Sequence, residues 1–358
     1  MSDHPLSTEK IRSFLRRKAA DAFLVDSIKN VRYLTGFTGS SAFVLLTRER
    51  GLFFTDFRYQ EQARSEVRGW EIMMERGKRI DTLRKTALNL GVRSLGFETS
   101  VSFEFYSELK RLRLNLIPVK RLVESLRKIK SDLELSRIRE AVRRAEQAFL
   151  RTVPFVRVVA REQTLALRLE EFLRKEGCRH AAFDIIVASG KNSSMPHAKT
   201  TDKKIEKGDF VIIDWGGEAD GYYSDMTRTL LAEGPALSEK KNIYEVVNSA
   251  REKALAAVAV GIPARDIDGH ARRAIGKAGY GDLFGHATGH GVGLDVHEAP
   301  RISWTNSERL GEGMVFTIEP GIYKPGLGGV RIEDMVVLSG GNALLMTSLP
   351  RDLAIIKS

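Results

Sequence analysis

Cysteine is nearly missing from this sequence, because Cys178 is the only one among 358 residues. A single cysteine cannot form a disulfide within the chain, so the fold does not depend on oxidation. That property suits a reducing compartment. Cys178 falls near the end of an expected helix, where a small structural residue is a better interpretation than a nucleophile.

Long apolar runs are missing as well. No segment approaches the ~20 apolar residues that a bilayer span needs. The first twenty residues lack the apolar stretch and the small-residue cleavage site of a signal peptide. We therefore expect a cytoplasmic protein.

An excess of acid is also absent, because 57 Lys and Arg stand against 46 Asp and Glu, a formal net charge of +11. The basic residues are spread along helical patterns such as 110–130. They do not gather in a tail or in a stripe interleaved with aromatic residues. We interpret them as solvated helix faces and expect no nucleic-acid partner.

Two domains are expected at this length. In residues 1–125, short apolar runs that predict strands alternate with amphipathic runs that predict helices, as in a small α/β domain. The expected strands are 22–25, 42–46, 52–55 and 70–74, and the expected helices are 57–67, 79–90 and 102–112. No catalytic cluster is visible here, so packing, assembly or limited substrate access is the expected role.

The second domain, 131–358, begins with a capping box in which Glu134 follows Ser131 by three residues. Beyond it one pattern occurs twice: two helices, a histidine, and a glycine six residues before an acid that ends an apolar strand. The copies comprise helices near 131–151 and 162–176, His197 and Gly208 to Asp214, then helices near 238–260 and 264–278, His297 and Gly313 to Glu319. We expect a duplicated α+β unit whose halves face each other across a pseudo-twofold axis.

The first copy ends in a hairpin that is expected to place two acids face to face. If 218–221 is a four-residue loop, Gly217 pairs with Tyr222, and Asp214 then lies directly opposite Asp225. Opposed side chains have Cβ atoms ~4.5–5.5 Å apart, and like charges at that distance are destabilising.

The second hairpin repeats this arrangement. With 324–328 as its loop, Tyr323 pairs with Gly329, and Glu319 lies opposite Glu333. Four carboxylates beside apolar strands need raised pKa values or cations, and two divalent cations would neutralise them. We therefore expect a metal site in preference to satisfied polar strand residues.

The segment 285–298 supplies His286, His290 and His297, spaced by glycines and small residues that let imidazoles converge. An oxygen-rich set with one imidazole suits Mn²⁺ or Co²⁺, with Zn²⁺ as a further option, whereas Mg²⁺ and Ca²⁺ sites rarely include histidine. We expect two divalent ions per chain, Mn²⁺ first.

With these motifs the chain closely resembles the "pita-bread" peptidases, which include Xaa-Pro aminopeptidases, prolidases and methionine aminopeptidases. The motifs within 131–358 are SGKNSSMPHA, GDFVIIDWG, DGYYSDMTRT, HATGHGVGLDVHE, FTIEPGIY and GGVRIED. The N-terminal half resembles Xaa-Pro peptidases in YLTGFTGSSAFVLL and TDFRYQEQA, and methionine aminopeptidases lack such a domain. The resemblance implies a pita-bread catalytic domain of the α+β class in 131–358 and a creatinase-like α/β domain in 1–125.

The resemblance also implies five metal ligands: Asp214, Asp225, His290, Glu319 and Glu333. Asp225 and Glu333 would bridge the two ions. Asp214 would chelate one ion, and His290 with Glu319 would complete the other.

Further roles follow from the same resemblance. His197 and His297 would hold the substrate and stabilise the tetrahedral intermediate, and His286 would line the pocket near the proline. Arg331 would lie beside the bridging glutamate. Glu319 would take the proton of the attacking water and pass it to the leaving nitrogen.

The implied reaction is hydrolysis of the peptide bond that precedes proline, by water acidified between two cations. An aminopeptidase P removes the first residue of longer peptides, whereas a prolidase cuts only dipeptides. The segments GFTGSS and TDFRY favour the aminopeptidase. A metal-free relative such as creatinase, or a non-catalytic binding protein with the same fold, would have lost some of the ligands, yet all five are present. A homodimer is implied by the resemblance alone.

Overall fold

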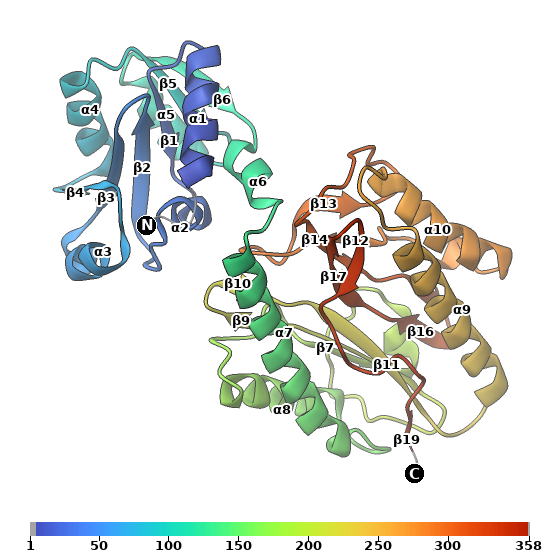
Figure 1. The fold of residues 1–358 in the computed structure, drawn as a ribbon. Coiled ribbons are helices and arrows are strands. Elements are labelled where there is room, and N and C mark those ends of the chain that lie inside the picture. The colour runs from blue at the N-terminus through green and yellow to red at the C-terminus, as the bar shows by residue number, and fades with distance from the viewer. Residues whose placement is uncertain (1–4, 357–358) are drawn as a thin grey trace. The chain divides into compact units, whose positions relative to one another are not determined.

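The computed structural model describes residues 5–356, and the chain divides into two compact units between Arg127 and Lys128 (Figure 1). Each unit has a hydrophobic core of its own. Within the described residues, every helix is either too short or too polar to pass through a bilayer.

The first unit is built on a six-stranded mixed sheet with the order β4-β3-β2-β1-β5-β6. Its strands are β1 (Ala22–Val25), β2 (Ala42–Thr47), β3 (Gly51–Thr55), β4 (Glu71–Met74), β5 (Ser94–Glu98) and β6 (Asn115–Val119). Strand β2 runs antiparallel to both β1 and β3, and the other neighbours are parallel.

Helices cover this sheet. They are α1 (Pro5–Arg17), α2 (Ile28–Thr35), the 3₁₀ turn η1 (Phe57–Tyr59), α3 (Gln60–Glu66), α4 (Arg79–Asn89), α5 (Phe103–Lys110) and α6 (Leu122–Arg127). Leu83 of α4 and Leu109 of α5 are buried in one cluster with Phe43 and Phe54, whose rings stack at 4.4 Å between centroids. The expected α/β fold of this half is confirmed.

The segment 110–130 differs from its expected helical pattern. Strand β6 occupies part of it at the edge of the sheet, and only the short α6 follows. Pro118 cannot donate a hydrogen bond to a neighbouring strand, and an edge strand tolerates that loss. The helical interpretation was therefore wrong for β6. Its proline made the sequence look unlike a strand.

The second unit contains the expected duplication. Helices α7 (Asp132–Thr152) and α8 (Glu162–Lys175) precede the first set of strands, and α9 (Leu237–Ala256) and α10 (Ala264–Lys277) precede the second. Figure 1 shows the α7–α8 pair on one side of these strands and the α9–α10 pair on the other. The α+β class is confirmed.

The strands of this unit form a four-stranded sheet, β19-β11-β8-β7, a five-stranded sheet, β13-β12-β14-β17-β18, and the two-stranded ladders β9–β10 and β15–β16. In chain order, with the 3₁₀ turns, the elements are η2 (Val153–Phe155), β7 (Ile186–Ser189), η3 (Gly190–Ser194), β8 (Phe210–Trp215), β9 (Glu218–Ala219), β10 (Tyr222–Tyr223), β11 (Met226–Ala232), η4 (Gly281–Leu283), β12 (Gly289–Gly291), β13 (Glu298–Ile302), β14 (Val315–Ile318), β15 (Gly321–Lys324), β16 (Gly328–Arg331), β17 (Asp334–Ser339), β18 (Asn342–Leu345) and β19 (Ile355–Ile356).

Helix α7 packs on β8 through Trp215. The indole is fully buried, stacks on Phe149 at 4.3 Å between centroids, and donates from Nε1 to the Ala145 carbonyl at 2.9 Å. A large buried aromatic side chain contributes several kcal/mol, about 3–5 when it is truncated to alanine. This contact fixes the strand that carries Asp214.

The first hairpin turns through two residues instead of four. Tyr222 pairs with Ala219. Between them, Asp220 and Gly221 have φ values of 49° and 81°, as the two central residues of a type I′ turn require. The expected pairing of Tyr222 with Gly217 was wrong.

The shorter turn moves the register by two residues. Asp214 lies opposite Thr227, and not opposite Asp225 as expected. A shift of two residues keeps every side chain on its original face, because side chains alternate with a period of two. Asp225 is therefore a diagonal neighbour of Asp214 on the same face.

The expected register of the second hairpin is confirmed, because Tyr323 pairs with Gly329. Strands β14 and β17 continue in the same register beyond the bend, and the loop itself is limited to 325–327. Glu319 and Glu333 fall between these two ladders. They face each other where the strand pairing is interrupted.

Candidate metal centre

The structure brings all five expected ligands together. Three groups have ligand atoms within 4.8 Å of one another: Asp214, Asp225 and Glu333; His290, Glu319 and Glu333; and Asp225, His290 and His297. Asp225, His290 and Glu333 each belong to two groups, and of these three only Asp225 and Glu333 are carboxylates, with two oxygens to offer.

Two carboxylate oxygens in this cluster lack partners. Within residues 5–356, Asp214 Oδ1 and Glu333 Oε1 are buried without a hydrogen bond. The Glu333 residue is only 2% exposed and Asp225 only 4%. Buried anionic oxygens without partners are costly, and coordination of a cation satisfies them. The donor set, mostly oxygen with one or two imidazoles, fits divalent metal ions.

The acids also perturb one another. Burial is the largest cause that raises the pKa of Asp225 well above its ordinary value, and the carboxylates of Glu333 and Asp214 raise it further. Burial, followed by the charges of Glu319 and Asp214, does the same to the pKa of Glu333. Burial also raises the pKa of Glu319. The cluster therefore favours either protons or cations.

His290 completes the cluster. Its Nε2 lies 3.4 Å from Asp225 Oδ2 and 3.5 Å from Glu319 Oε1, and its ring lies 4.3 Å from that of His297. Burial lowers the pKa of His290, and partial burial, followed by the charge of His290, lowers the pKa of the more exposed His297. Both rings are therefore held in the neutral form, the form that binds metal.

Arg331 orients the acids from behind. Its Nη2 donates to Asp214 Oδ2 at 2.6 Å, and its Nε donates to Thr227 Oγ1 at 3.0 Å. The Thr227 hydroxyl in turn donates to Glu333 Oε2 at 2.8 Å. Arg331 thus pairs directly with Asp214 and reaches the expected bridging glutamate through a threonine.

The same arginine fixes the protonation of His286. Its Nη1 donates to the Tyr323 hydroxyl at 2.8 Å, and a guanidinium has no acceptor. The tyrosine proton therefore points to His286 Nε2 at 2.9 Å, and His286 Nδ1 donates to the Ala287 carbonyl at 2.8 Å. Burial lowers the pKa of His286, in agreement with a neutral ring.

Tyr323 and Thr227 were not predicted as site residues. Tyr323 lies four residues after Glu319 and faces Gly329, two residues before Arg331. Residues two or four apart along a strand share a face. The register that paired Tyr323 with Gly329 could have placed the tyrosine beside the acids, and the same rule places Thr227 beside Asp225.

His197 lies outside the three groups of ligand atoms and is exposed. The preceding carbonyl, of Pro196, accepts from Arg331 Nη1 at 3.1 Å, so the segment reaches the back of the metal cluster. A charge on His197 would lower the pKa of both His286 and His297. The expected outer histidines are thus within electrostatic reach of one another.

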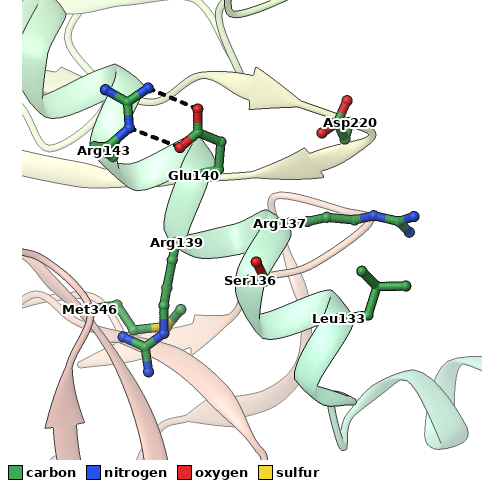
Figure 2. Close-up of a pocket in the computed structure, with 8 residues that line it drawn as sticks. All are labelled: Leu133, Ser136, Arg137, Arg139, Glu140, Arg143, Asp220 and Met346. Atoms are coloured by element: carbon green, nitrogen blue, oxygen red, sulfur yellow. Dashed lines mark hydrogen bonds and ion pairs between the residues drawn. The ribbon is translucent and has the colours of Figure 1, made fainter.

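A separate open hollow of about 710 Å³ lies along α7, lined by Leu133, Ser136, Arg137, Arg139, Glu140, Arg143, Asp220 and Met346. Figure 2 shows its three arginines pointing in different directions, with Arg143 bound to Glu140 at 2.8 Å. No expected site residue lines this hollow, and its guanidinium groups do not converge on one ligand position.

Two family models match the chain. Residues 136–339 match metallopeptidase family M24, and residues 8–129 match the creatinase/prolidase N-terminal domain. The chain is also 41% identical over 354 residues to the uncharacterized peptidase YqhT of Bacillus subtilis (strain 168), covering 98% of this chain and 100% of that protein.

Solved structures are similar over nearly the whole chain. The Xaa-Pro dipeptidase from Bacillus anthracis has a TM-score of 0.95 and 39% identity, covering 98% of this chain and 99% of the other. The X-Pro aminopeptidase from Thermotoga maritima MSB8 has a TM-score of 0.88 and 37% identity, covering 95% and 99%.

Proposed function

Because the chain belongs to metallopeptidase family M24 and is similar to the Xaa-Pro dipeptidase from Bacillus anthracis, we propose that it hydrolyses the peptide bond preceding proline, with Xaa-Pro dipeptides as substrates. The observation that carries this proposal is the buried cluster of four carboxylates and His290, two of whose oxygens lack hydrogen bonds within the described residues. Such a cluster is unfavourable without bound cations.

Two divalent ions, Mn²⁺ first, would be held by Asp214, Asp225, His290, Glu319 and Glu333. When bound, they would acidify a water molecule and polarise the scissile carbonyl. Asp225 and Glu333 are proposed to be shared between the ions, because each is a buried carboxylate that belongs to two of the ligand groups.

The remaining steps belong to side chains of this protein. Glu319 is proposed to accept the proton of the attacking water at its carboxylate and to deliver it to the leaving nitrogen. His197 and His297 are exposed, so each is free to donate a hydrogen bond to the developing oxyanion.

The leaving nitrogen belongs to proline, whose tertiary amide has no N–H. A proline site therefore needs a closely fitting surface without an acceptor for that missing proton. His286 is proposed to line it, because the ring is neutral and both of its nitrogens are already engaged by Tyr323 and Ala287.

A second candidate is the Xaa-Pro aminopeptidase activity that the sequence favoured. Similarity to the X-Pro aminopeptidase from Thermotoga maritima supports it, whereas similarity to the Xaa-Pro dipeptidase from Bacillus anthracis supports the dipeptidase. The two activities differ in the room beyond the proline. A homodimer and a cytoplasmic location are further proposals, the first from the family resemblance and the second from the single cysteine.

One assay tests the function. The protein is stripped with a chelator and loaded separately with Mn²⁺, Co²⁺ or Zn²⁺, and cleavage of an Xaa-Pro dipeptide is compared with cleavage of an Xaa-Pro-Xaa tripeptide. We expect metal-dependent cleavage of the dipeptide and little of the tripeptide. Efficient cleavage of the tripeptide would favour the aminopeptidase, and no cleavage of either substrate with any metal would refute the proposal.

A further inference from the structure

Two of the fully buried carboxylates outside the metal centre stand on equivalent helices of the two copies. Glu162 is the first residue of α8, and Asp268 belongs to α10, the equivalent helix of the second copy. Both residues are 0% exposed. Charged side chains are rarely buried without a reason, so the groups that surround them indicate what they do.

Glu162 holds both ends of one segment. Its Oε1 accepts from the backbone N–H and the hydroxyl of Ser189 at 2.6 and 2.8 Å. Its Oε2 accepts from the backbone N–H and the hydroxyl of Thr201 at 3.0 and 2.6 Å. The Asn192 amide donates to both oxygens at 3.1 Å. One carboxylate therefore closes the chain between Ser189 and Thr201.

This closed segment carries His197. Moving either of its ends would remove two of the three donors to one buried carboxylate oxygen, which is costly. The segment also contains the Pro196 carbonyl that Arg331 binds. The segment that carries His197 is thus bound to α8 at both of its ends. Next to His197, it is bound to the guanidinium that pairs with Asp214.

Asp268 holds a segment of the second copy. Its Oδ1 accepts from the backbone N–H and the hydroxyl of Thr288 at 3.1 and 2.9 Å. It also pairs with both sides of the Arg272 guanidinium, at 2.9 and 3.0 Å. Arg272 then donates to the carbonyls of Phe284 and His286 at 2.8 Å each.

The segment held by Asp268 leads directly into the metal centre. The Thr288 carbonyl accepts from the backbone N–H of Glu319 at 2.8 Å, and His290 follows two residues later. A displacement of Thr288 would therefore move His290, Glu319 and His286 together.

The two anchors share one device. In each copy a threonine, Thr201 or Thr288, gives its backbone N–H and its hydroxyl to the same carboxylate oxygen. Each carboxylate stands on the second helix of its copy, and both helices have 14 residues. Recurrence of the device in both halves indicates a shared task.

We propose that Glu162 and Asp268 are positioning residues, Glu162 for His197 and Asp268 for His286 and His290. The roles of these histidines rest on the function proposed above. The two anchors differ in one respect that an experiment can use: residues 189–201 contain no expected metal ligand, whereas the segment held by Asp268 leads into one.

The first test is Glu162→Gln, whose amide nitrogen cannot accept from Ser189 or Thr201. We expect kcat/KM for an Xaa-Pro dipeptide to fall ~10–100-fold, the range found when a group that orients a reacting side chain is lost. The visible spectrum of the Co²⁺-loaded protein should stay as in the wild type. Adding Glu162→Gln to His197→Ala should cost less than about twofold more, because the two changes remove one function.

The second test is Asp268→Asn. This change should alter the Co²⁺ spectrum and weaken Co²⁺ binding ~10–100-fold, because the segment it releases leads to His290. A wild-type spectrum and wild-type Co²⁺ affinity in this variant would overturn the role of Asp268. For Glu162, an altered Co²⁺ spectrum in Glu162→Gln would overturn the proposal. So would a double variant with His197→Ala whose loss of kcat/KM equals the product of the two single losses.

Matched controls come from the same helices. Glu171→Gln on α8 and Asp266→Asn on α10 change exposed carboxylates and should give wild-type kinetics and spectra. If these controls reproduce the losses, helix charge and not the buried contacts is responsible, which overturns the proposal.

A further measurement does not depend on activity. The chain has seven histidines, so His197→Ala identifies the NMR signal of one labelled imidazole. Glu162→Gln should shift or broaden that signal, and an unchanged signal would overturn the role of Glu162. If the wild type cleaves no Xaa-Pro peptide, the proposed function fails. The His197 NMR signal and the Co²⁺ spectrum still test whether Glu162 and Asp268 position the histidines.

Should a carboxamide variant fail to fold, Thr201→Val and Thr288→Val each remove one hydroxyl donor to the same carboxylates. They should give weaker forms of the same two patterns. Wild-type kinetics and an unchanged His197 signal in Thr201→Val, or a wild-type Co²⁺ spectrum and affinity in Thr288→Val, would overturn the corresponding anchor.

Discussion

Asp225 and Glu333 are nearly inaccessible to solvent, and other acids surround them. Burial and the charges of neighbouring acids raise the pKa of both, and Glu333 has one oxygen without a hydrogen bond within the described residues. These residues therefore destabilise the metal-free fold. Their arrangement is favourable only when the negative charge is balanced.

Glu333→Gln separates the two effects. It removes one like charge while keeping the size of the side chain. We expect turnover of Xaa-Pro peptides to fall at least ~100-fold because a shared ligand is lost. The metal-free variant should be about 1–3 kcal/mol more stable than the metal-free wild type, since a glutamine needs neither a proton nor a cation to be neutral when buried.

Steady-state kinetics with Mn²⁺ and urea denaturation with chelator measure the two quantities. Glu245→Gln is the control, because Glu245 is exposed on α9. If Glu333→Gln kept more than a tenth of the wild-type activity, the substitution would cost less than ~1.4 kcal/mol of activation free energy. Such a small cost would contradict the shared-ligand role.

The raised pKa values of Asp225, Glu319 and Glu333 determine the direction in which the stability of the metal-free protein changes with pH. In the metal-free protein these groups hold protons that the unfolded chain releases at lower pH. The stability of the metal-free protein therefore falls as the pH rises from their unfolded to their folded pKa values. Metal binding needs ionised carboxylates, so it strengthens over the same window.

We expect the difference between Tm with Mn²⁺ and Tm with chelator to widen as the pH rises from about 5 to about 8. Differential scanning fluorimetry at fixed Mn²⁺ excess measures it. A difference that narrows with rising pH would mean that the acids are ionised in the free protein.

At the scale of elements, helix α7 begins with the capping box that the sequence predicts. Ser131 Oγ accepts from the Glu134 N–H at 3.3 Å, and the Glu134 carboxylate accepts from the Ser131 N–H at 2.9 Å. The other oxygen of Glu134 accepts from the Tyr222 hydroxyl at 3.1 Å. The cap therefore also ties α7 to the first hairpin.

Ser131→Ala should destabilise the catalytic unit by about 1 kcal/mol, the usual cost of losing a capping hydroxyl. Urea denaturation measures this loss. Ser136→Ala lies within the same helix on an exposed position and should be neutral or slightly stabilising, because alanine has the higher helix propensity. Equal losses in both variants would assign the effect to helix composition and not to the cap.

Sequence patterns predicted helices better than turns in this chain. The periodic segments predicted α7, α8 and α10 to within about one residue, because an apolar stripe at helical spacing has few alternatives, whereas the helix expected at 238–260 ends at Ala256. The first hairpin was predicted with a four-residue loop because its sequence does not exclude one, whereas Asp220-Gly221 forms a two-residue turn. Strand β6 was missed because Pro118 interrupts its pattern.

The acids were nevertheless expected on the correct face, because the error in register was two residues and not one. Glu162 and Asp268 could not be singled out by spacing alone. Their importance arises from contacts with residues distant in the sequence, as when Glu162 joins Ser189 to Thr201.

At the scale of the whole molecule, each unit has its own hydrophobic core, and all five expected ligands belong to the second unit. Calorimetry of the full chain should therefore resolve two unfolding transitions. Chelator should lower only one of them, because a ligand stabilises the unit that binds it. An equal shift of both transitions would mean that the units unfold cooperatively.

Cys178 gives this molecule a built-in reporter. The thiol is 5% exposed, burial raises its pKa to about 11, and its sulfur packs closely against Gly217, just beyond the strand that carries Asp214. Because the chain has no second thiol, a maleimide can label a cysteine only when the contact between Cys178 and Gly217 opens. The rate of labelling thus reports how often the structure beside the strand with Asp214 opens spontaneously. A decrease of this rate on addition of Mn²⁺ measures how much the bound ions stabilise the closed state.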